Sequence, residues 1–327
     1  MSSSGLIRNL IIVCVLLLLV SALLIGVYVW ERGRYEYPEL DDFEEYGSLS
    51  YDGKLYEERK DVMTVLFIGV DSPDGSAPSV SSYNNDYHAD FLMLMAIDRT
   101  NKRCSAIHIN RDTMADVTVL GVGGRTVGVV NEQIALSHTY GSGGQDSCRN
   151  VLKSVSSLLF GVNIDHYISV AMSSVPKIND AIGGVTLTVL DDFSSIDEAL
   201  VQGKEVTLNG AQALCYVRSR AGLENSSNLA RMARQRQYLD SAYNAIEEKK
   251  AQNADFVDTL AKSLFDVTVT DFDIAVLQDV LDTVMTYDRG EIYSLEGESS
   301  VSDGFMQFHV DEQKAKKLVI ELLYKES

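Results

Sequence analysis

Five arginines gather in one short segment of a strongly acidic protein. The formal net charge of the chain is −19, yet Glu224 is the only acid between Leu214 and Tyr238, where the arginines are Arg218, Arg220, Arg231, Arg234 and Arg236. A guanidinium is a planar fork that stays charged and can bond two oxygens of one phosphate. The segment therefore predicts a site for a ligand that carries several phosphate oxygens.

The spacing of these residues indicates how they could meet. Arg218 and Arg220 are two residues apart, so they share a face only if the chain is extended there. Arg231 and Gln235 are four residues apart and share one face of a helix, with Arg234 beside them. We expect the opposite face of that helix to dock on the core through an apolar stripe formed by Leu229, Met232, Leu239, Tyr243 and Ile246.

The alternative is that these arginines form salt bridges with the chain's own carboxylates. That interpretation is the better one for any single arginine. It is weaker for the cluster, because acids are not interleaved with the arginines at the i±4 positions. A polyanion site is the prediction that follows.

Two aspartates could supply a metal site. Asp71 follows the apolar run VMTVLFIGV, and Asp90 opens the next run, FLMLMAID. Ligands often bind at strand ends in α/β sheets, and Mg²⁺ is usually held by one or two carboxylates with phosphate oxygens and water. The competing interpretation is that each aspartate is only a loop or capping residue. Asp112 directly follows Arg111, and we expect it to orient or neutralise nearby cations.

The N-terminal part of the chain predicts a membrane anchor. Residues 10–30 form an uncharged apolar run long enough to span a bilayer as a helix, and no clean cleavage site follows it. We expect residues 1–9 in the cytoplasm, an uncleaved transmembrane anchor and the large acidic domain outside the cell. Residues 31–60 are predicted to be an acidic membrane-proximal spacer. A hairpin signal at Asp52-Gly53 within it could instead begin the folded domain.

The remaining residues, 61–327, predict an α/β domain. Apolar runs of strand length alternate with helical patterns, which indicates a central mixed β-sheet flanked by helices. Strands are expected at 62–70, 91–98, 104–110, 165–172 and 185–190, with a hairpin at 117–130 and a strand pair at 291–294 and 305–309. Helices are expected at 132–140, 146–160, from 173 to the Gly183-Gly184 break, and at 229–249, 254–265, 273–285 and 311–324.

Composition argues against two other classes of protein. An acidic chain is a poor general binder of nucleic acid, because such proteins normally carry a basic surface. The cysteines have no CxxC spacing and the chain has five histidines, so a zinc site is not expected. Outside the apolar run we expect three buried thiols, although a disulfide between Cys104 and Cys148 stays open.

Several segments, in order along the chain, resemble the LytR-CpsA-Psr family of bacterial cell-wall glycopolymer transferases. They are VLFIGVDS, HADFLMLMAIDRTNK, INRDT, NEQIALSHTYGSGG, GVNIDHYISV, IGGVTLTV, LNGAQALCYVRSR and NLARMARQRQ. Together these core motifs cover roughly residues 62–245, and residues 246–327 would be a C-terminal extension. The single N-terminal anchor also fits this family.

The resemblance implies roles for individual residues. Asp71 and Asp90 match the family's two aspartates, which are associated with Mg²⁺ and the pyrophosphate of the substrate. Arg111 matches the arginine of the RDT motif, and Arg218 and Arg220 match those of YxRxR. Matches to the GRxxRQ motif are Arg231, Arg234 and Gln235. In the family these groups hold the pyrophosphate of a polyprenyl-linked glycan, whose lipid tail lies in an apolar tunnel.

Four positions depart from the family pattern. His88 and Pro73 stand where the family often has arginines, near the second and the first aspartate respectively. Asn228 replaces the acid of the DxGR pattern, and Arg236 replaces the second glutamine of RQQ. These changes alter individual phosphate contacts and leave the aspartate pair and the central arginines in place.

The resemblance implies a Mg²⁺-dependent phosphotransferase that moves a phosphoglycan from a polyprenyl-pyrophosphate carrier to a hydroxyl of peptidoglycan. The glycan would be a teichoic acid, capsule or similar polymer. Such a reaction mainly requires positioning and charge stabilisation. Asp71 would be the base if it does not hold the metal ion. Two alternatives stay open: a polyprenyl-pyrophosphate hydrolase, and a non-catalytic, membrane-tethered binder of lipid-linked glycans.

Overall fold

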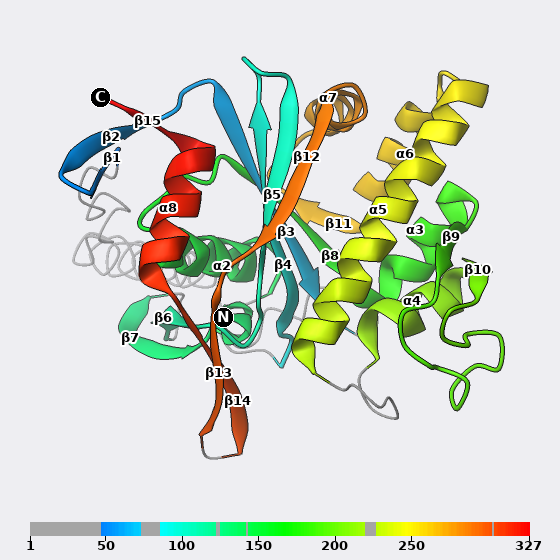
Figure 1. Cartoon of the computed structure of the whole chain (residues 1–327), viewed down its shortest axis with the longest axis horizontal. Coiled ribbons are helices and arrows are strands. Elements are labelled where there is room, and N and C mark those ends of the chain that lie inside the picture. Colours follow the sequence, from blue (N-terminus) through cyan, green and yellow to red (C-terminus); the bar gives the residue numbers. More distant parts are fainter. Residues whose placement is uncertain (1–46, 73–85, 122–124, 142, 220–226, 303) are drawn as a thin grey trace, which may run out of the picture. The chain divides into compact units, whose positions relative to one another are not determined.

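The computed structural model describes residues 47–72, 86–121, 125–141, 143–219, 227–302 and 304–327 (Figure 1). They belong to one folded unit, Tyr46–Ser327. The predicted anchor and the first part of the spacer lie outside the described residues. No helix in the described ranges is long and apolar enough to cross a membrane.

A mixed sheet of six strands forms the centre of the fold, as predicted. Its order is β11-β8-β3-β4-β5-β12. The strands are β3 (Val62–Val70), β4 (Ala89–Asp98), β5 (Arg103–Ile109), β8 (His166–Ala171), β11 (Thr268–Thr270) and β12 (Asp288–Ser294). The pairs β3–β8 and β5–β12 are parallel, and the other neighbours are antiparallel.

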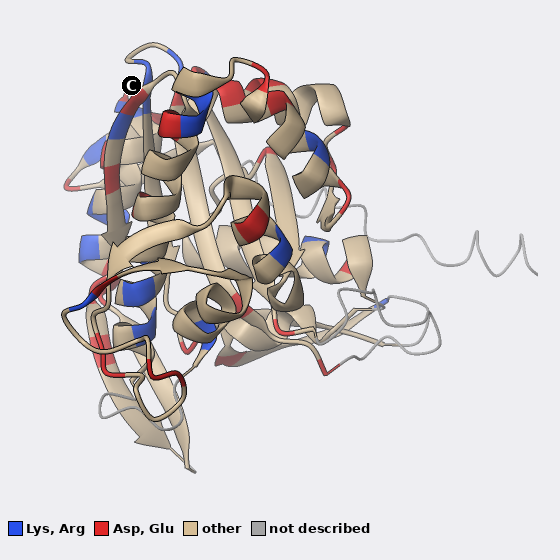
Figure 2. Cartoon of the chain, turned by 90° about the vertical axis from the view of Figure 1, so that its right-hand side faces the viewer, with Lys and Arg blue, Asp and Glu red and all other residues tan. Residues whose placement is uncertain are grey.

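The central strands are apolar because both faces of the sheet are covered. Along β3, Leu66 and Ile68 pack into one core cluster, whereas Val65 and Phe67 pack into another on the opposite face. A strand buried on both sides reads as a continuous apolar run. The strands are almost free of charge between their ends (Figure 2). In β3, β4 and β5, charged side chains are therefore confined to the ends of the strands.

Helices cover both faces, which confirms the predicted α-β-α arrangement. One face packs against α2 (Gly144–Leu158) and α8 (Glu312–Leu323). Towards the other face lie α3 (Val175–Ile182), α4 (Gly210–Arg218), α5 (Asn228–Gln252), α6 (Phe256–Phe265) and α7 (Ile274–Val284) (Figure 1). Short 3₁₀ helices at Ile134–His138 and Met172–Ser174 complete the helical elements of the described residues.

The hairpin at Asp52-Gly53 forms and belongs to the folded unit. Strands β1 (Ser48–Tyr51) and β2 (Lys54–Glu58) pair around a two-residue turn, in which Asp52 and Gly53 have φ of 49° and 74°. Positive φ at both positions is the requirement of a type I′ turn. The C-terminal strand β15 (Tyr324–Glu326) pairs with β2, so the two ends of this unit lie side by side.

The predicted strand at 185–190 forms as β9 (Val185–Thr188), and it pairs with β10 (Glu205–Leu208) outside the central sheet. Two other sequence-based expectations about elements were wrong. The strands near 291–294 and 305–309 do not pair with each other. Strand β12 is the outermost strand of the central sheet, next to β5, and β14 (Phe305–Val310) pairs with β13 (Gly297–Ser302).

The second wrong expectation is the helix at 132–140. The hairpin of β6 (Met114–Leu120) and β7 (Thr126–Gln133) continues through Glu132, and only a short 3₁₀ helix follows. Pairing of Glu132 and Gln133 with β6 keeps this segment extended. The cysteines outside the apolar run, Cys104, Cys148 and Cys215, are free thiols.

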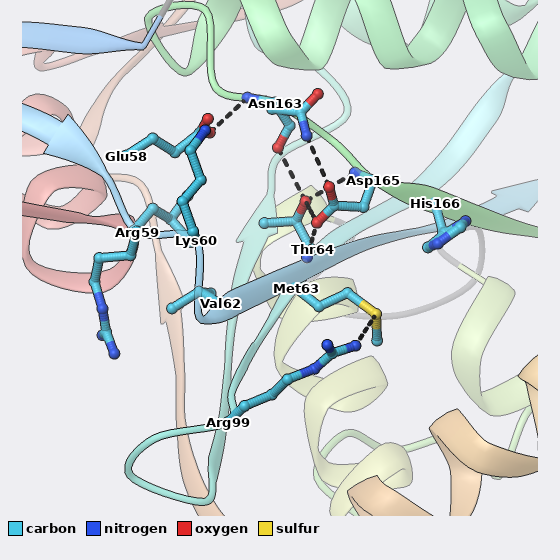
Figure 3. Close-up of a pocket in the computed structure, with 11 residues that line it drawn as sticks. Glu58, Arg59, Lys60, Val62, Met63, Thr64, Arg99, Asn163, Asp165 and His166 are labelled. Atoms are coloured by element: carbon cyan, nitrogen blue, oxygen red, sulfur yellow. Dashed lines mark hydrogen bonds between the residues drawn. The ribbon is translucent and has the colours of Figure 1, made fainter.

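The carboxylate of Asp165 joins the beginning of β3 to the chain that enters β8. Asp165 accepts hydrogen bonds from the Thr64 backbone N–H (2.8 Å), the Thr64 hydroxyl (3.2 Å) and the Asn163 side-chain amide (2.7 Å) (Figure 3). These bonds set the register of two parallel neighbours in the sheet.

We expect Asp165→Ala to lower the free energy of unfolding by about 1–3 kcal/mol, since it leaves the buried backbone N–H of Thr64 without its acceptor, while the Thr64 hydroxyl still donates to the carbonyl of Asn163. Urea denaturation of the folded unit measures this loss. The matched control is Asp279→Ala, which removes an exposed acid on α7 and should change stability by less than about 0.5 kcal/mol. Equal effects of the two substitutions would contradict the role assigned to Asp165.

Candidate functional site

The predicted aspartates and Arg111 lie at one edge of the central sheet. Strands β3, β5, β8 and β12 all end at this edge and β4 begins there. Asp71 directly follows β3, and its backbone N–H donates to the carbonyl of His88 just before β4 (3.0 Å). Asp90 is the second residue of β4, and Arg111 lies two residues beyond β5. The sheet therefore brings together residues that are up to 40 positions apart in the sequence.

An irregularity in the β3–β4 pairing sets the direction of the Asp90 side chain. Gly69 lies opposite Phe91 and Val70 opposite Ala89, so Asp90 has no partner residue in β3. Such bulges bend a strand and re-aim a side chain, often beside a functional site. A Cβ atom on Gly69 would lie only 2.8 Å from the Cβ of Phe91, so this close approach requires glycine.

Asp90 is buried between two arginines. One carboxylate oxygen accepts a hydrogen bond from Nη1 of Arg111, and the other accepts one from Nη1 of Arg231 at 3.2 Å. The Arg231 side chain is 2% exposed, and Nε of Arg111 also lies 3.3 Å from the carboxylate of Asp112. Buried charges are tolerated only when paired and hydrogen-bonded. The ion pairs therefore fix the end of β5 and the start of α5 against β4.

Asn228 stands where the family pattern has an acid, and its side chain is hydrogen-bonded to the neutral side chain of Asn110. The Asp112 backbone N–H donates to Asn110 Oδ1 (2.9 Å), which identifies that atom as oxygen. The Asn228 atom 2.5 Å from it must then be the amide nitrogen, so the other end of the Asn228 side chain is the oxygen that accepts from Arg231 Nη2 (2.6 Å). The Asn110–Asn228 pair thus orients Arg231 without a second carboxylate.

Arg218 reaches the site from the end of a helix that the sequence analysis did not predict. Asn209 and Gln212 form a capping box at the start of α4, and this N-x-x-Q pattern is the signal that was missed. Arg218 is the last residue of α4, and its Nη2 lies 2.5 Å from Oδ1 of Asp71. The chain at Arg218 is therefore helical and not extended. Arg220 lies outside the described residues.

The side chains of Arg234 and Gln235 form hydrogen bonds within the protein. The guanidinium of Arg234 is fully buried and donates to the carbonyls of Tyr216 (3.0 Å) and Ser219 (2.5 Å) and to Asp191. The side-chain amide of Gln235 donates to the carbonyl of Val217 (3.1 Å). These are the last carbonyls of α4, which have no partner within the helix. Arg234 and Gln235 therefore hold the end of α4, and with it Arg218, against α5.

The predicted orientation of α5 was wrong. Arg231, Arg234 and Gln235 lie on the buried face, whereas Leu229 and Leu239 of the apolar stripe are 52% and 37% exposed. The polar side chains are buried because Asp90 and the carbonyls of α4 provide partners for them. The later residues of the stripe face a cavity.

Two apolar cavities extend from this edge between the sheet and the helices. One has a volume of about 300 Å³ between β3–β5 and α5–α7, and its lining includes Phe67, Met93, Met95, Leu239, Tyr243 and Leu264. The other, of about 180 Å³, reaches Val217 and Gln235 at the end of α4. Both are lined by Phe67, Phe91, Ile178, Tyr238 and Leu239. Together they provide apolar space directly behind the arginine-bearing helix ends.

The family resemblance implied an apolar tunnel, whereas the residue patterns alone did not predict these cavities, although they contain a signal for them. Met93 and Met95 alternate with Leu92 and Leu94 on β4, so one face of the strand carries long, flexible side chains. Such side chains are also common in ordinary cores. Only the structure shows that they line open space.

A buried imidazole lies beneath the arginines. Burial, together with the charges of Arg236 and Arg231, lowers the pKa of His108 to about 3, so the ring is neutral at physiological pH. Its ring stacks against Phe91 with centroids 4.9 Å apart. His108 Nδ1 lies 3.5 Å from Nη1 of Arg236, which also donates to the Ser294 hydroxyl (3.1 Å). His108 therefore contributes no charge to this edge of the sheet.

The oxygen chemistry of Asp71 and Asp90 suits Mg²⁺. In the described residues no group of three or more His, Cys, Asp or Glu side chains is placed to hold a metal ion. Two carboxylates are sufficient for Mg²⁺ when phosphate and water supply the other ligands. Each aspartate is paired with arginine, and each carboxylate oxygen still has a second lone pair.

A polar cavity of about 320 Å³ lies at the opposite edge of the sheet, where β3 and β8 begin (Figure 3). Its acids Glu58 and Asp165 accept hydrogen bonds from Asn163 and Thr64. Its cations Lys60 and Arg99 are exposed. The cavity is separated from the arginine cluster by the length of the strands, so it is not part of the candidate site.

Comparison with known proteins gives a consistent result. The model of the LytR_cpsA_psr family matches residues 36–322. A polyisoprenyl-teichoic acid–peptidoglycan teichoic acid transferase, TagU of Oceanobacillus iheyensis, is 27% identical over 82% of this chain and 77% of its own length. Biofilm regulatory protein A of Streptococcus mutans is 25% identical over 91% of this chain and 71% of its own.

Solved structures share the fold at lower identity. The structure titled TagT bound to LI-WTA has a TM-score of 0.60 at 19% identity, covering 80% of this chain and 90% of that one. Protein gbs0355 of Streptococcus agalactiae has a TM-score of 0.64 at 19% identity, covering 80% and 86% respectively.

We expect Asn228→Asp to destabilise the fold. The substitution places a carboxylate oxygen against Asn110 Oδ1, and turning Asn110 away would break its bond from the Asp112 N–H. A loss of about 1–3 kcal/mol in the free energy of unfolding is expected. The control is Asn244→Asp on α5, where the side-chain oxygen accepts from Arg289 (3.1 Å) and a carboxylate would keep that bond. Urea denaturation that shows Asn228→Asp to be as stable as this control would contradict the amide assignment.

Proposed function

The chain belongs to the LytR_cpsA_psr family, and we propose that it moves a phosphoglycan from a polyprenyl-pyrophosphate carrier to a hydroxyl of peptidoglycan. The observation that carries this proposal is the position of Arg111, Arg218 and Arg231 at the head of an apolar cavity. A lipid-linked pyrophosphate has the matching chemistry, with charge at one end and a hydrocarbon tail at the other. The relatives named as teichoic acid transferases support a teichoic acid or similar polymer as the glycan.

The exposed arginine is the one best placed to meet the incoming phosphate. The side chain of Arg218 is 50% exposed, and that of its partner Asp71 is 35% exposed. Arg111 and Arg231 lie deeper, on the carboxylate of Asp90. We propose that these three, together with Arg220, contact the pyrophosphate. Arg234 and Gln235 would act on it through the position of α4.

Asp71 and Asp90 would hold a Mg²⁺ ion. When bound, the ion would neutralise charge on the pyrophosphate oxygens. Binding of metal and pyrophosphate together would let the ion pairs exchange partners, because the carboxylates would meet the cation and the arginines would meet the phosphates. No buried charge would be left without an opposite charge during that exchange.

The proposed reaction forms one phosphodiester and breaks one phosphoanhydride. The acceptor hydroxyl attacks the phosphorus attached to the glycan, the bond from that phosphorus to the bridging oxygen breaks, and polyprenyl phosphate leaves with the electron pair. The hydroxyl proton passes to a base. Asp71 would take it only in a state in which it does not hold the metal ion. The arginines offset the charge that develops on the departing phosphate.

We further propose that residues 10–30 anchor the protein in the cell membrane with the folded unit outside the cell. This places the cavity on the side where lipid-linked glycans meet peptidoglycan. The two alternatives, a hydrolase and a non-catalytic binder, use the same site. Product analysis with and without a peptidoglycan acceptor separates them: transfer requires the acceptor, a hydrolase releases polyprenyl phosphate without it, and a binder gives no product.

We expect Arg218→Ala to lower kcat/KM for transfer about 30- to 1,000-fold, the usual effect of removing one charged donor from a developing oxyanion. Its half-exposed ion pair should add less than about 1 kcal/mol to stability. Arg149→Ala removes an exposed arginine from α2 on the far face of the sheet and serves as the control. Equal transfer rates for the two variants would exclude Arg218 from phosphate binding.

Metal removal tests the role of the aspartates. Chelation with EDTA should abolish transfer, and excess Mg²⁺ should restore it, because carboxylates and phosphate oxygens are hard ligands. Turnover that is unaffected by EDTA would remove Mg²⁺ from the proposal and leave the arginines as the sole source of positive charge.

A further inference from the structure

Arg236 forms no ion pair with a carboxylate in the part of the chain that the structure describes. Within the described part of the chain, Arg111, Arg218, Arg231 and Arg234 each have a carboxylate within 4 Å, whereas Arg236 has none. It is partly buried, and its hydrogen-bond partners are neutral groups, the Ser294 hydroxyl and His108. Asp240, one turn further along α5, is paired with Arg289 at 2.8 Å.

The surroundings of Arg236 favour a bound anion. Burial lowers the pKa of its guanidinium, and the charge of Asp240 opposes this shift only in part. A partly buried cation without an acid partner is stabilised by an anionic ligand. His108 does not compete with that ligand, because its ring is neutral and serves as an acceptor for Arg236.

Arg236 extends the row of cations along the edge of the sheet. Arg218 lies at the end of β3, and Arg231 and Arg111 meet Asp90 at β4 and β5. Arg236 contacts Ser294 at the end of β12 and His108 near the end of β5. Strands are spaced by about 4.8 Å. Arg236 is therefore one to two strand spacings, roughly 5–10 Å, from Asp90 along this end of the sheet.

These arginines lie beside the two apolar cavities. Phe91 lines both apolar cavities and stacks on His108, which lies directly beneath Arg236. A donor whose pyrophosphate sits at Arg111, Arg218 and Arg231 and whose tail enters the cavity can direct its glycan along this end of the sheet, past β5 and β12. Arg236 and Ser294 lie at that end.

We propose that Arg236 and the Ser294 hydroxyl form a subsite for an anionic group, a phosphate or a carboxylate, on the glycan of the donor. This inference rests on the proposed function and names its substrate class: the enzyme prefers a glycan that is charged within about one sugar of the pyrophosphate. The glutamine found at this position in the family pattern can also bond an oxygen but brings no charge.

Two synthetic donors test the subsite with the full chain in detergent. Both carry a geranylgeranyl pyrophosphate and a disaccharide; one disaccharide is neutral and the other contains a uronic acid. We expect the wild type to prefer the charged donor. Arg236→Gln should reduce that preference about 10- to 100-fold, mainly through KM, since a charged hydrogen bond contributes about 1.5–3 kcal/mol. Arg236→Lys should retain part of the preference.

The outcomes separate this subsite from the proposed function. Equal losses on both donors would assign Arg236 to the pyrophosphate and overturn the subsite, as would no loss on either. If the wild type transfers neither donor, the proposed function fails. Ser294→Ala provides a second variant should Arg236→Gln not fold, with a smaller change in the same direction. Arg149→Gln controls for overall charge.

Discussion

The carboxylate of Asp90, shared by Arg111 and Arg231, is the interaction on which the site depends. It joins three elements: the bulged start of β4, the chain beyond β5 and the first turns of α5. Removing Asp90 would take this carboxylate away from the buried guanidinium of Arg231, which costs several kcal/mol. The arginines are therefore held in position before a ligand arrives, and binding does not have to order them.

A second set of contacts positions the more exposed part of the site. Arg234 and Gln235 bond the last carbonyls of α4, and Arg218 extends from the end of that helix to Asp71. Arginines of similar appearance in the sequence thus have different tasks. Arg234 is fully buried and structural, whereas Arg218 is half exposed and able to contact a ligand. Behind them, apolar cavities provide space for hydrocarbon, so charge and hydrophobic surface meet at one edge of the sheet.

The sequence predicted the parts of the structure that local pattern determines. The apolar run of β3, the Asp52-Gly53 turn and the positions of Asp71 and Asp90 at strand ends follow from periodicity and turn chemistry. The burial of Arg234 could not be predicted from local pattern, because its acceptors, the carbonyls of α4 and the carboxylate of Asp191, come from other parts of the chain. The pairing of β12 with β5 is likewise a contact between distant segments. The cavities depend on how helices sit on the sheet, which single-residue patterns do not encode.

The most direct test of the central claim is a crystal structure of the folded unit with geranylgeranyl pyrophosphate bound. The account predicts the pyrophosphate within hydrogen-bonding distance of Arg111, Arg218 and Arg231, and the hydrocarbon chain between β3–β5 and α5. A pyrophosphate bound at another surface, or a chain that lies outside the two apolar cavities, would contradict it.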